Sequence, residues 1–148
     1  MPDLSEHWLQ VESPLGPNKL AVTGVQFEEG FNRLSRGFVE VASVDGEIEL
    51  DKLIGEEMVV VMKQPDGGTR KFRGICVSLA SLGKKSGYER YAAELRSWFW
   101  VLSKSKDCRI FQEKSVEQIF DEITQDFGFT DVDKNLHENH PTHEYLSL

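Results

Sequence analysis

Three histidines near the end of the chain come closest, by type and spacing, to a metal site. His137, His140 and His143 follow one another at intervals of three residues, and imidazole is a common zinc ligand. That spacing brings the rings together only if the backbone cooperates, and Pro141 inside the run opposes a helix that would stack them. We therefore expect hydrogen-bonding surface residues. A small metal- or ligand-binding barrel enzyme that uses these histidines is the alternative.

Two tryptophans form the second group. Trp98 and Trp100 stand two residues apart, so they share one face of the strand that the sequence predicts over Tyr88–Leu102. Such a pair can be a stacking platform for sugars or bases, or an apolar strip in a core or an interface. Because the neighbouring residues are apolar, we expect the strip, and Trp98→Ala then costs about 3–5 kcal/mol if the ring is core.

Other signs of catalysis or cofactor binding are missing from the sequence. It has no GxSxG elbow, glycine-rich phosphate loop or HExxH motif. Gly67 and Gly68 follow Pro65 and Asp66, which is typical of a hairpin corner. Cys76 and Cys108 belong to no CxxC pair, and we expect both to be buried, reduced thiols in strands. The prediction is a protein without enzymatic activity or cofactor.

Charge is concentrated at one end of the chain. The net charge is −8 overall, and residues 113–148 carry nine acids against two lysines. This acidic segment disfavours binding to nucleic acid or to an anionic membrane. It is interpreted as a solvated helix face and loop, with a surface for a basic partner as the alternative. No run approaches the length of a membrane-spanning helix, and the first residues lack the pattern of a signal peptide, which predicts a cytoplasmic start.

The elements that must position these residues are mostly strands. Alternating or β-branched runs bounded by turn residues predict strands over Trp8–Val11, Lys19–Phe27, Gly37–Val44, Met58–Lys63, Thr69–Leu82, Tyr88–Leu102 and Glu144–Leu148.

One helix is predicted after Ser115. Gln118 stands three residues further on, which is the capping-box spacing, and apolar residues recur at helical steps until Gly128. The expected fold class is mainly β: an antiparallel barrel or strongly bent sheet, arranged as a meander, with one α-helix packed on it. We expect a single barrel-type domain over residues 1–148, in which 113–148 form the acidic helix and the following loop.

The region from Tyr88 to Ile123 resembles the signature stretch of VgrG proteins, the spike proteins of type VI secretion. That family has an LRPWLWLL-like strand end, a D-S-R-I-F-Q segment and a capped helix that begins K-S-V. Ser97 stands where the family usually has proline, and Cys108 where it usually has serine. The matching residues that we take as structural signature positions are Arg96, Trp98, Trp100, Arg109, Phe111, Gln112 and Ser115.

The resemblance implies a phage tail-hub-like fold and a mechanical role. Family members form trimers that sit on a tube of Hcp and are often tipped by a PAAR protein. The resemblance thus implies a homotrimeric hub in the puncturing spike, cytoplasmic before firing and then ejected without a signal peptide. It also implies that this chain is an N-terminal fragment of a longer spike protein. The related tail hub of contractile phages, of the late-control D type, is the alternative.

Overall fold

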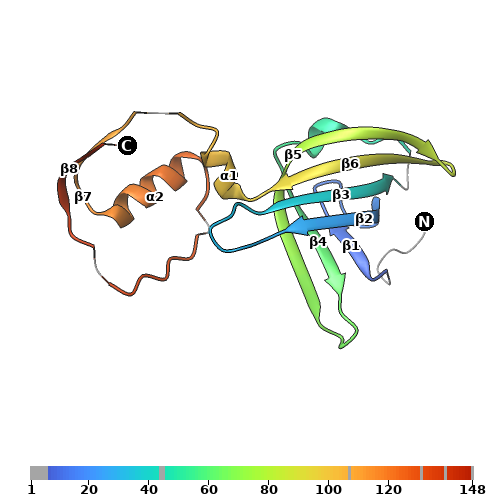
Figure 1. Ribbon diagram of the computed structural model, residues 1–148. Helices are drawn as coiled ribbons and strands as arrows, with labels where there is room; N and C mark the ends of the chain where they lie inside the picture. The colour runs from blue at the N-terminus through green and yellow to red at the C-terminus, as the bar shows by residue number, and fades with distance from the viewer. Residues whose placement is uncertain (1–6, 44–45, 107, 131, 139, 148) are drawn as a thin grey trace. The chain divides into compact units, whose positions relative to one another are not determined.

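The computed structural model describes residues 7–43, 46–106, 108–130, 132–138 and 140–147. The chain divides into two compact units, Met1–Trp100 and Val101–Leu148 (Figure 1). The acidic segment 113–148 lies in the second unit.

The first unit is a six-stranded antiparallel sheet with the strand order β1-β4-β5-β6-β3-β2. It curls into a nearly closed, barrel-like sheet (Figure 1), which confirms the mainly β fold class. The order is not the simple meander that we predicted, because β1 pairs with β4 and β3 pairs with β6. The strands are β1 (Leu9–Glu12), β2 (Leu20–Glu28), β3 (Arg36–Ser43), β4 (Glu57–Lys63), β5 (Thr69–Lys85) and β6 (Tyr88–Arg96).

The hairpin between β4 and β5 forms where the turn residues predicted it. Gly67 has a φ of 85°, a backbone conformation that glycine adopts without steric cost. The backbone N–H of Gly68 donates to the Asp66 side chain at 2.9 Å. The continuous apolar run before this turn is covered on both faces, as predicted, since Met58–Val61 are all buried.

The core of the first unit lies inside the curled sheet. Alternate residues of β3 and β6 point inward, as a two-residue period requires, and Val39, Val41, Ala93 and Leu95 are almost completely buried. A short 3-10 helix, η1 (Leu50–Lys52), precedes Leu53, which is also fully buried.

The end of β6 differs from the prediction. The strand stops at Arg96, and Trp98–Leu102 form the short helix α1. The backbone N–H of Ser97 still donates to the Ser35 carbonyl at 3.3 Å, whereas the N–H of Trp100 turns back to the Ser97 carbonyl at 3.0 Å. The predicted strand over Tyr88–Leu102 was therefore wrong beyond Arg96, because a short run that is apolar on all sides suits a helix as well as a strand.

Beyond the end of α1, the described residues of the second unit form the helix α2 and two short strands. Strand β7 (Ile110–Lys114) leads directly into α2 (Val116–Asp126), and β7 pairs antiparallel with β8 (His143–Ser147). Helix α2 packs against β7. The predicted helix and final strand are thus both present. Among the described residues, no helix has the length and apolar character needed to cross a membrane.

The two cysteines lie in different environments. Cys76 is a free thiol buried in β5, as predicted. Cys108 is also free, but it is exposed and lies outside any strand, so the expectation of a second buried thiol was wrong.

Candidate functional site

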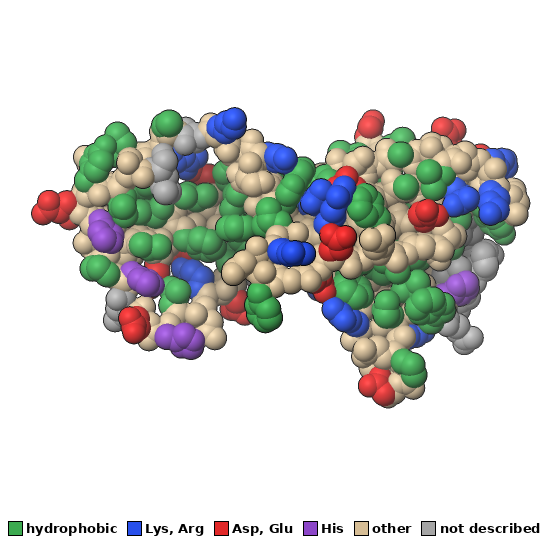
Figure 2. Space-filling model, viewed as in Figure 1, with side chains coloured by type: hydrophobic (Ala, Val, Ile, Leu, Met, Phe, Trp, Pro, Cys, Tyr) green, Lys and Arg blue, Asp and Glu red, His purple; other side chains and the backbone are tan. Residues whose placement is uncertain are grey.

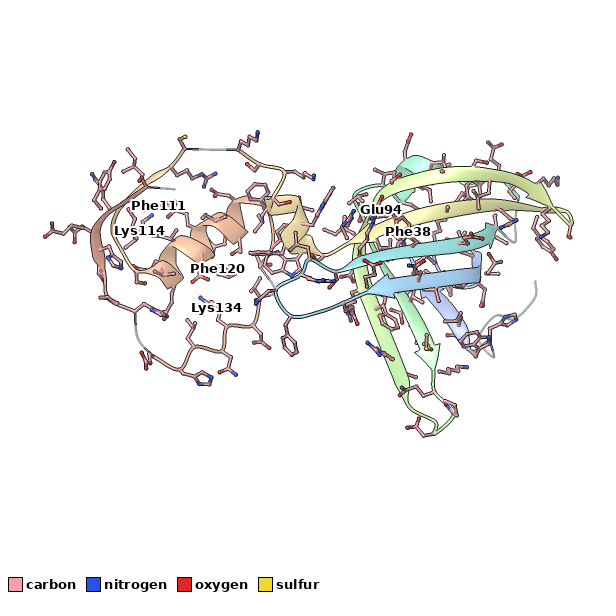
Figure 3. All side chains as sticks on the ribbon, viewed as in Figure 1. Phe38, Glu94, Phe111, Lys114, Phe120 and Lys134 are labelled. Atoms are coloured by element: carbon pink, nitrogen blue, oxygen red, sulfur yellow. The ribbon has the colours of Figure 1, made fainter. Side chains whose placement is uncertain are left out.

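A cluster of charged side chains lies on the outer surface of the first unit, where β6 ends. The sheet register places Arg36 opposite Arg96 and Phe38 opposite Glu94. Two arginines facing each other would repel, and the carboxylate of Glu94 lies between them. Glu94 Oε1 accepts from Arg36 Nε at 3.0 Å and from Arg96 Nε at 2.8 Å. Figure 3 shows Glu94 and Phe38 on neighbouring strands at the same end of the sheet.

Both guanidinium groups of this cluster pack against aromatic rings. Arg36 lies 4.3 Å from the centre of the Phe38 ring, and Arg96 lies 5.4 Å from that of Trp100. Arginine stacks on aromatic faces through its planar, delocalised charge. These contacts fix the orientation of both guanidinium groups. They also bring together two of the predicted signature residues, Arg96 and Trp100.

The tryptophans do not form the predicted strand-borne strip. Trp98 and Trp100 lie on α1 and are both partly exposed. Trp98 meets Phe99 edge to face, with ring centres 5.4 Å apart. Burial of Trp98 in a core is therefore incorrect.

The predicted signature residues of the second unit lie around the start of α2. Ser115 is the N-cap: its side chain accepts from the Gln118 N–H at 3.4 Å, and its own N–H donates to Gln118 Oε1 at 2.8 Å. Phe111 is buried on β7, while Gln112 is exposed and pairs with Tyr145. Local sequence determines this arrangement, since the capping box satisfies two N–H groups that a helix start leaves open.

The acidic face of α2 is largely paired within its own unit. Lys114 and Arg109 form ion pairs with Glu122 and Asp126, respectively. Lys134, from the segment after the helix, binds both oxygens of Asp121 at 2.6 Å. Figure 3 labels Lys114 and Lys134, two of these cations, in the unit that contains α2. The sequence predicts a solvated face but not its pairing with flanking cations, because the pairing joins residues up to 17 positions apart.

A small apolar pocket of about 190 Å³ opens beside α2. Its walls are largely carbon, and Val116 and Leu136 each leave about half of their side chain exposed. The lining residues are Val116, Glu117, Phe120, Lys134, Leu136 and His140.

The histidines are placed separately. His140 lines this pocket, His143 begins β8 opposite Lys114, and His137 is exposed in the preceding segment. Within the described ranges, no group of three or more His, Cys, Asp or Glu side chains has an arrangement that could hold a metal ion.

The surface in view carries both signs of charge. Figure 2 shows Lys and Arg side chains interspersed with Asp and Glu, and with hydrophobic side chains, over the visible face. Such a mixed surface is more typical of protein contacts than of a phosphate-binding stripe.

Sequence reasoning identified Arg96 and Ser115 but missed Arg36, Glu94 and Lys134. Each of these three contributes through a partner that is distant in sequence. The one available signal was the alternation of charged and apolar residues along β3 and β6, which predicts a charged outer face but not which charges meet.

Comparisons with known proteins agree on one family. The model of the phage tail baseplate hub (GPD) family matches residues 28–147. Two curated relatives from Pseudomonas aeruginosa are similar to the chain: the type VI secretion system spike protein VgrG1c, at 35% identity over 138 residues, and VgrG1a, at 34% over 140 residues. The alignments cover 93% of this chain but only 19% and 21% of those relatives, so the chain spans about a fifth of their length.

A solved structure supports the fold. The E. coli c3393 protein, described as a component of the type VI secretion system with structural similarity to the T4 bacteriophage tail proteins gp27 and gp5, superposes with a TM-score of 0.62. The match covers 88% of this chain and 38% of that one, at 19% identity. The predicted resemblance to VgrG proteins is thus confirmed. Because the model of the phage tail baseplate hub family matches 120 consecutive positions of this chain, the chain belongs to that family.

Proposed function

We propose that this chain is a non-catalytic structural module of a type VI secretion spike and forms part of the hub that sits on the Hcp tube. The match of the tail baseplate hub model to residues 28–147 carries the proposal. The similarity to two VgrG spike proteins at about 35% identity favours secretion over a phage tail. The function is mechanical, so rigidity of the sheet and of its contacts is the property that matters.

The curled sheet of the first unit suits this role. Six strands joined by a continuous hydrogen-bonded ladder resist deformation along the strands, and the dense interior around Val39, Val41 and Leu95 resists compression. In the proposed assembly the protein acts as a homotrimer, binds Hcp at one end and connects to a PAAR tip at the other. It is held in the cytoplasm before firing and is ejected with the spike.

Co-sedimentation with assembled Hcp tubes tests this function. The chain is expected to pellet with the tubes and to stay in the supernatant without them. The variant Leu95→Ala, which weakens the core of the barrel-like sheet, should bind less, whereas Thr23→Ala, at an exposed position of β2 in the same unit, serves as the matched control. A chain that stays in solution at saturating tube concentration contradicts the proposal.

The second candidate is the tail hub of a contractile phage, which the family description itself favours. The same assay with phage tail tubes in place of Hcp separates the two. Preferential binding to the phage tube supports the tail hub and removes the secretion role.

A further inference from the structure

The arginine cluster of the first unit carries more positive than negative charge. Arg36 and Arg96 both bind one oxygen of Glu94, so two cations meet a single carboxylate. Arg36 reaches Glu94 through Nε alone, and its two Nη groups are not engaged with that carboxylate. Guanidinium groups fixed in this way bind a further carboxylate with two parallel hydrogen bonds and lose little entropy in doing so.

An exposed ring accompanies this charge. The Phe38 side chain is 41% exposed, and the Arg36 guanidinium covers one face of it. Arginine and aromatic residues are enriched at the centres of protein interfaces, where an aromatic anchor fills a pocket and neighbouring charges pair. The cluster therefore fits a partner surface with an apolar pocket beside a carboxylate.

The second unit has a surface of that description. The pocket of about 190 Å³ beside α2 is apolar and carries Glu117 in its lining. The other acids of the helix are engaged: Asp121, Glu122 and Asp126 each pair with a cation. None of the ion pairs among the described residues includes Glu117, so it keeps its charge available at the pocket.

We propose that these two surfaces bind each other between copies of this chain. Phe38 of one copy enters the pocket of a second, and Arg36 faces Glu117. The contact is heterologous, because each copy uses the cluster of one unit and the pocket of the other. Contacts of this kind form a closed ring when the rotation between copies closes. The contact deepens the proposed function by naming the subunit interface of the homotrimer, and its formation requires no Hcp.

Sedimentation velocity over a concentration series of the purified chain tests the contact. The chain should associate as its concentration rises. Arg36→Glu and Glu117→Lys each place like charges against one another, so each should weaken association by about tenfold or more, which corresponds to about 1.4 kcal/mol. Phe38→Ser removes the anchor and should have a similar effect. A chain that stays monomeric throughout overturns the inference.

An equal mixture of two variants gives the sharper result. Arg36→Glu copies have a negative charge at position 36 of the cluster and a native pocket. Glu117→Lys copies have a native cluster and a positive charge at the pocket. Each variant alone opposes like charges at every contact, whereas a contact between the two variants joins opposite charges, as do two of the three contacts in a mixed ring of three. The mixture should therefore associate more strongly than either variant, and equal weakness in all three samples overturns the inference. If the effects of the Arg36 and Glu117 substitutions depend on each other in a chain that stays monomeric, the two residues meet within one copy, and the inference is overturned as well.

Arg70→Glu is the matched control. Arg70 has the same kinds of contact as Arg36: it pairs with Glu29 at 2.8 Å and lies 4.6 Å from the centre of the Phe72 ring. It should leave association unchanged, and an equal loss with Arg70→Glu overturns the assignment of this surface. Failure of self-association together with retained binding to Hcp tubes removes this interface but not the proposed function.

Discussion

The ring of Phe27 occupies the space that a side chain on Gly37 would need. The two residues are partners in the β2–β3 register, and a Cβ atom at position 37 would lie 2.3 Å from Phe27 Cε1. Phe27 is also held by Phe72, because the two rings stack with their centres 4.6 Å apart. Position 37 must therefore stay without a side chain while Phe27 holds this place.

Gly37→Ala should destabilise the protein by about 1–3 kcal/mol, the usual cost of overpacking, although alanine is better than glycine in a strand by up to about 1 kcal/mol. Urea unfolding measures the change. Gly24→Ala is the control, because its Cβ would make only an ordinary 3.6 Å contact with Glu40. In a Phe27→Ala background the cost of Gly37→Ala should disappear; a cost that persists there shows that the ring is not its cause.

Substitution of Trp98 should cost less than substitution of a true core residue. Trp98 is partly exposed on α1, so Trp98→Ala should lower the free energy of unfolding by about 1–2 kcal/mol, largely through lost apolar contact and the edge-to-face pair. Leu95 is 1% exposed, and Leu95→Ala should cost about 2–5 kcal/mol. Denaturant melts of the two variants compare them directly. A larger loss for Trp98 than for Leu95 would place its ring in a core.

The parts of the fold that were predictable are those determined by neighbouring residues. The turn at Asp66–Gly67 and the cap at Ser115 depend on contacts within three positions, and both were found from sequence. The run Met58–Val61 identified a strand covered on both faces, since no polar residue interrupts it.

The parts that were missed depend on distant partners or on ambiguous periodicity. The pairing of β3 with β6 joins Arg36 to Arg96, and no local pattern specifies that choice. Helix α1 has five residues, four of them large and apolar, so strand and helix periods fit it equally. Cys108 was assigned to a strand from its neighbours, but β7 begins only at Ile110.

The Ser115 cap should contribute about 1 kcal/mol to the stability of α2. Ser115→Ala removes the acceptor of the Gln118 N–H, whereas Ser115→Asp keeps an acceptor and adds a charge that suits the start of the helix. Amide hydrogen exchange at Gln118 should therefore speed up in the alanine variant and stay slow in the aspartate variant. Equal exchange in the two variants would contradict a side-chain cap.

The two thiols should react in a fixed order. Burial raises the pKa of the Cys76 thiol, an effect that a hydrogen bond with the Ser78 backbone only partly offsets, so Cys76 is both inaccessible and slower to lose its proton as the pH rises. Cys108 is exposed and should take up one equivalent of a maleimide or of Ellman's reagent in the folded protein. Cys76 should react only after denaturant is added.

The raised pKa also has a consequence for stability. The folded state keeps the Cys76 proton to a higher pH than the unfolded chain does, so this contribution is fully present below the unfolded-state pKa and is lost as the pH rises through the folded-state value. Cys76→Ala should remove that alkaline loss, while Cys108→Ser should leave it unchanged. Rapid labelling of Cys76 in the native Cys108→Ser variant would show that the barrel interior opens on the time scale of the reaction, and would contradict a rigid hub module.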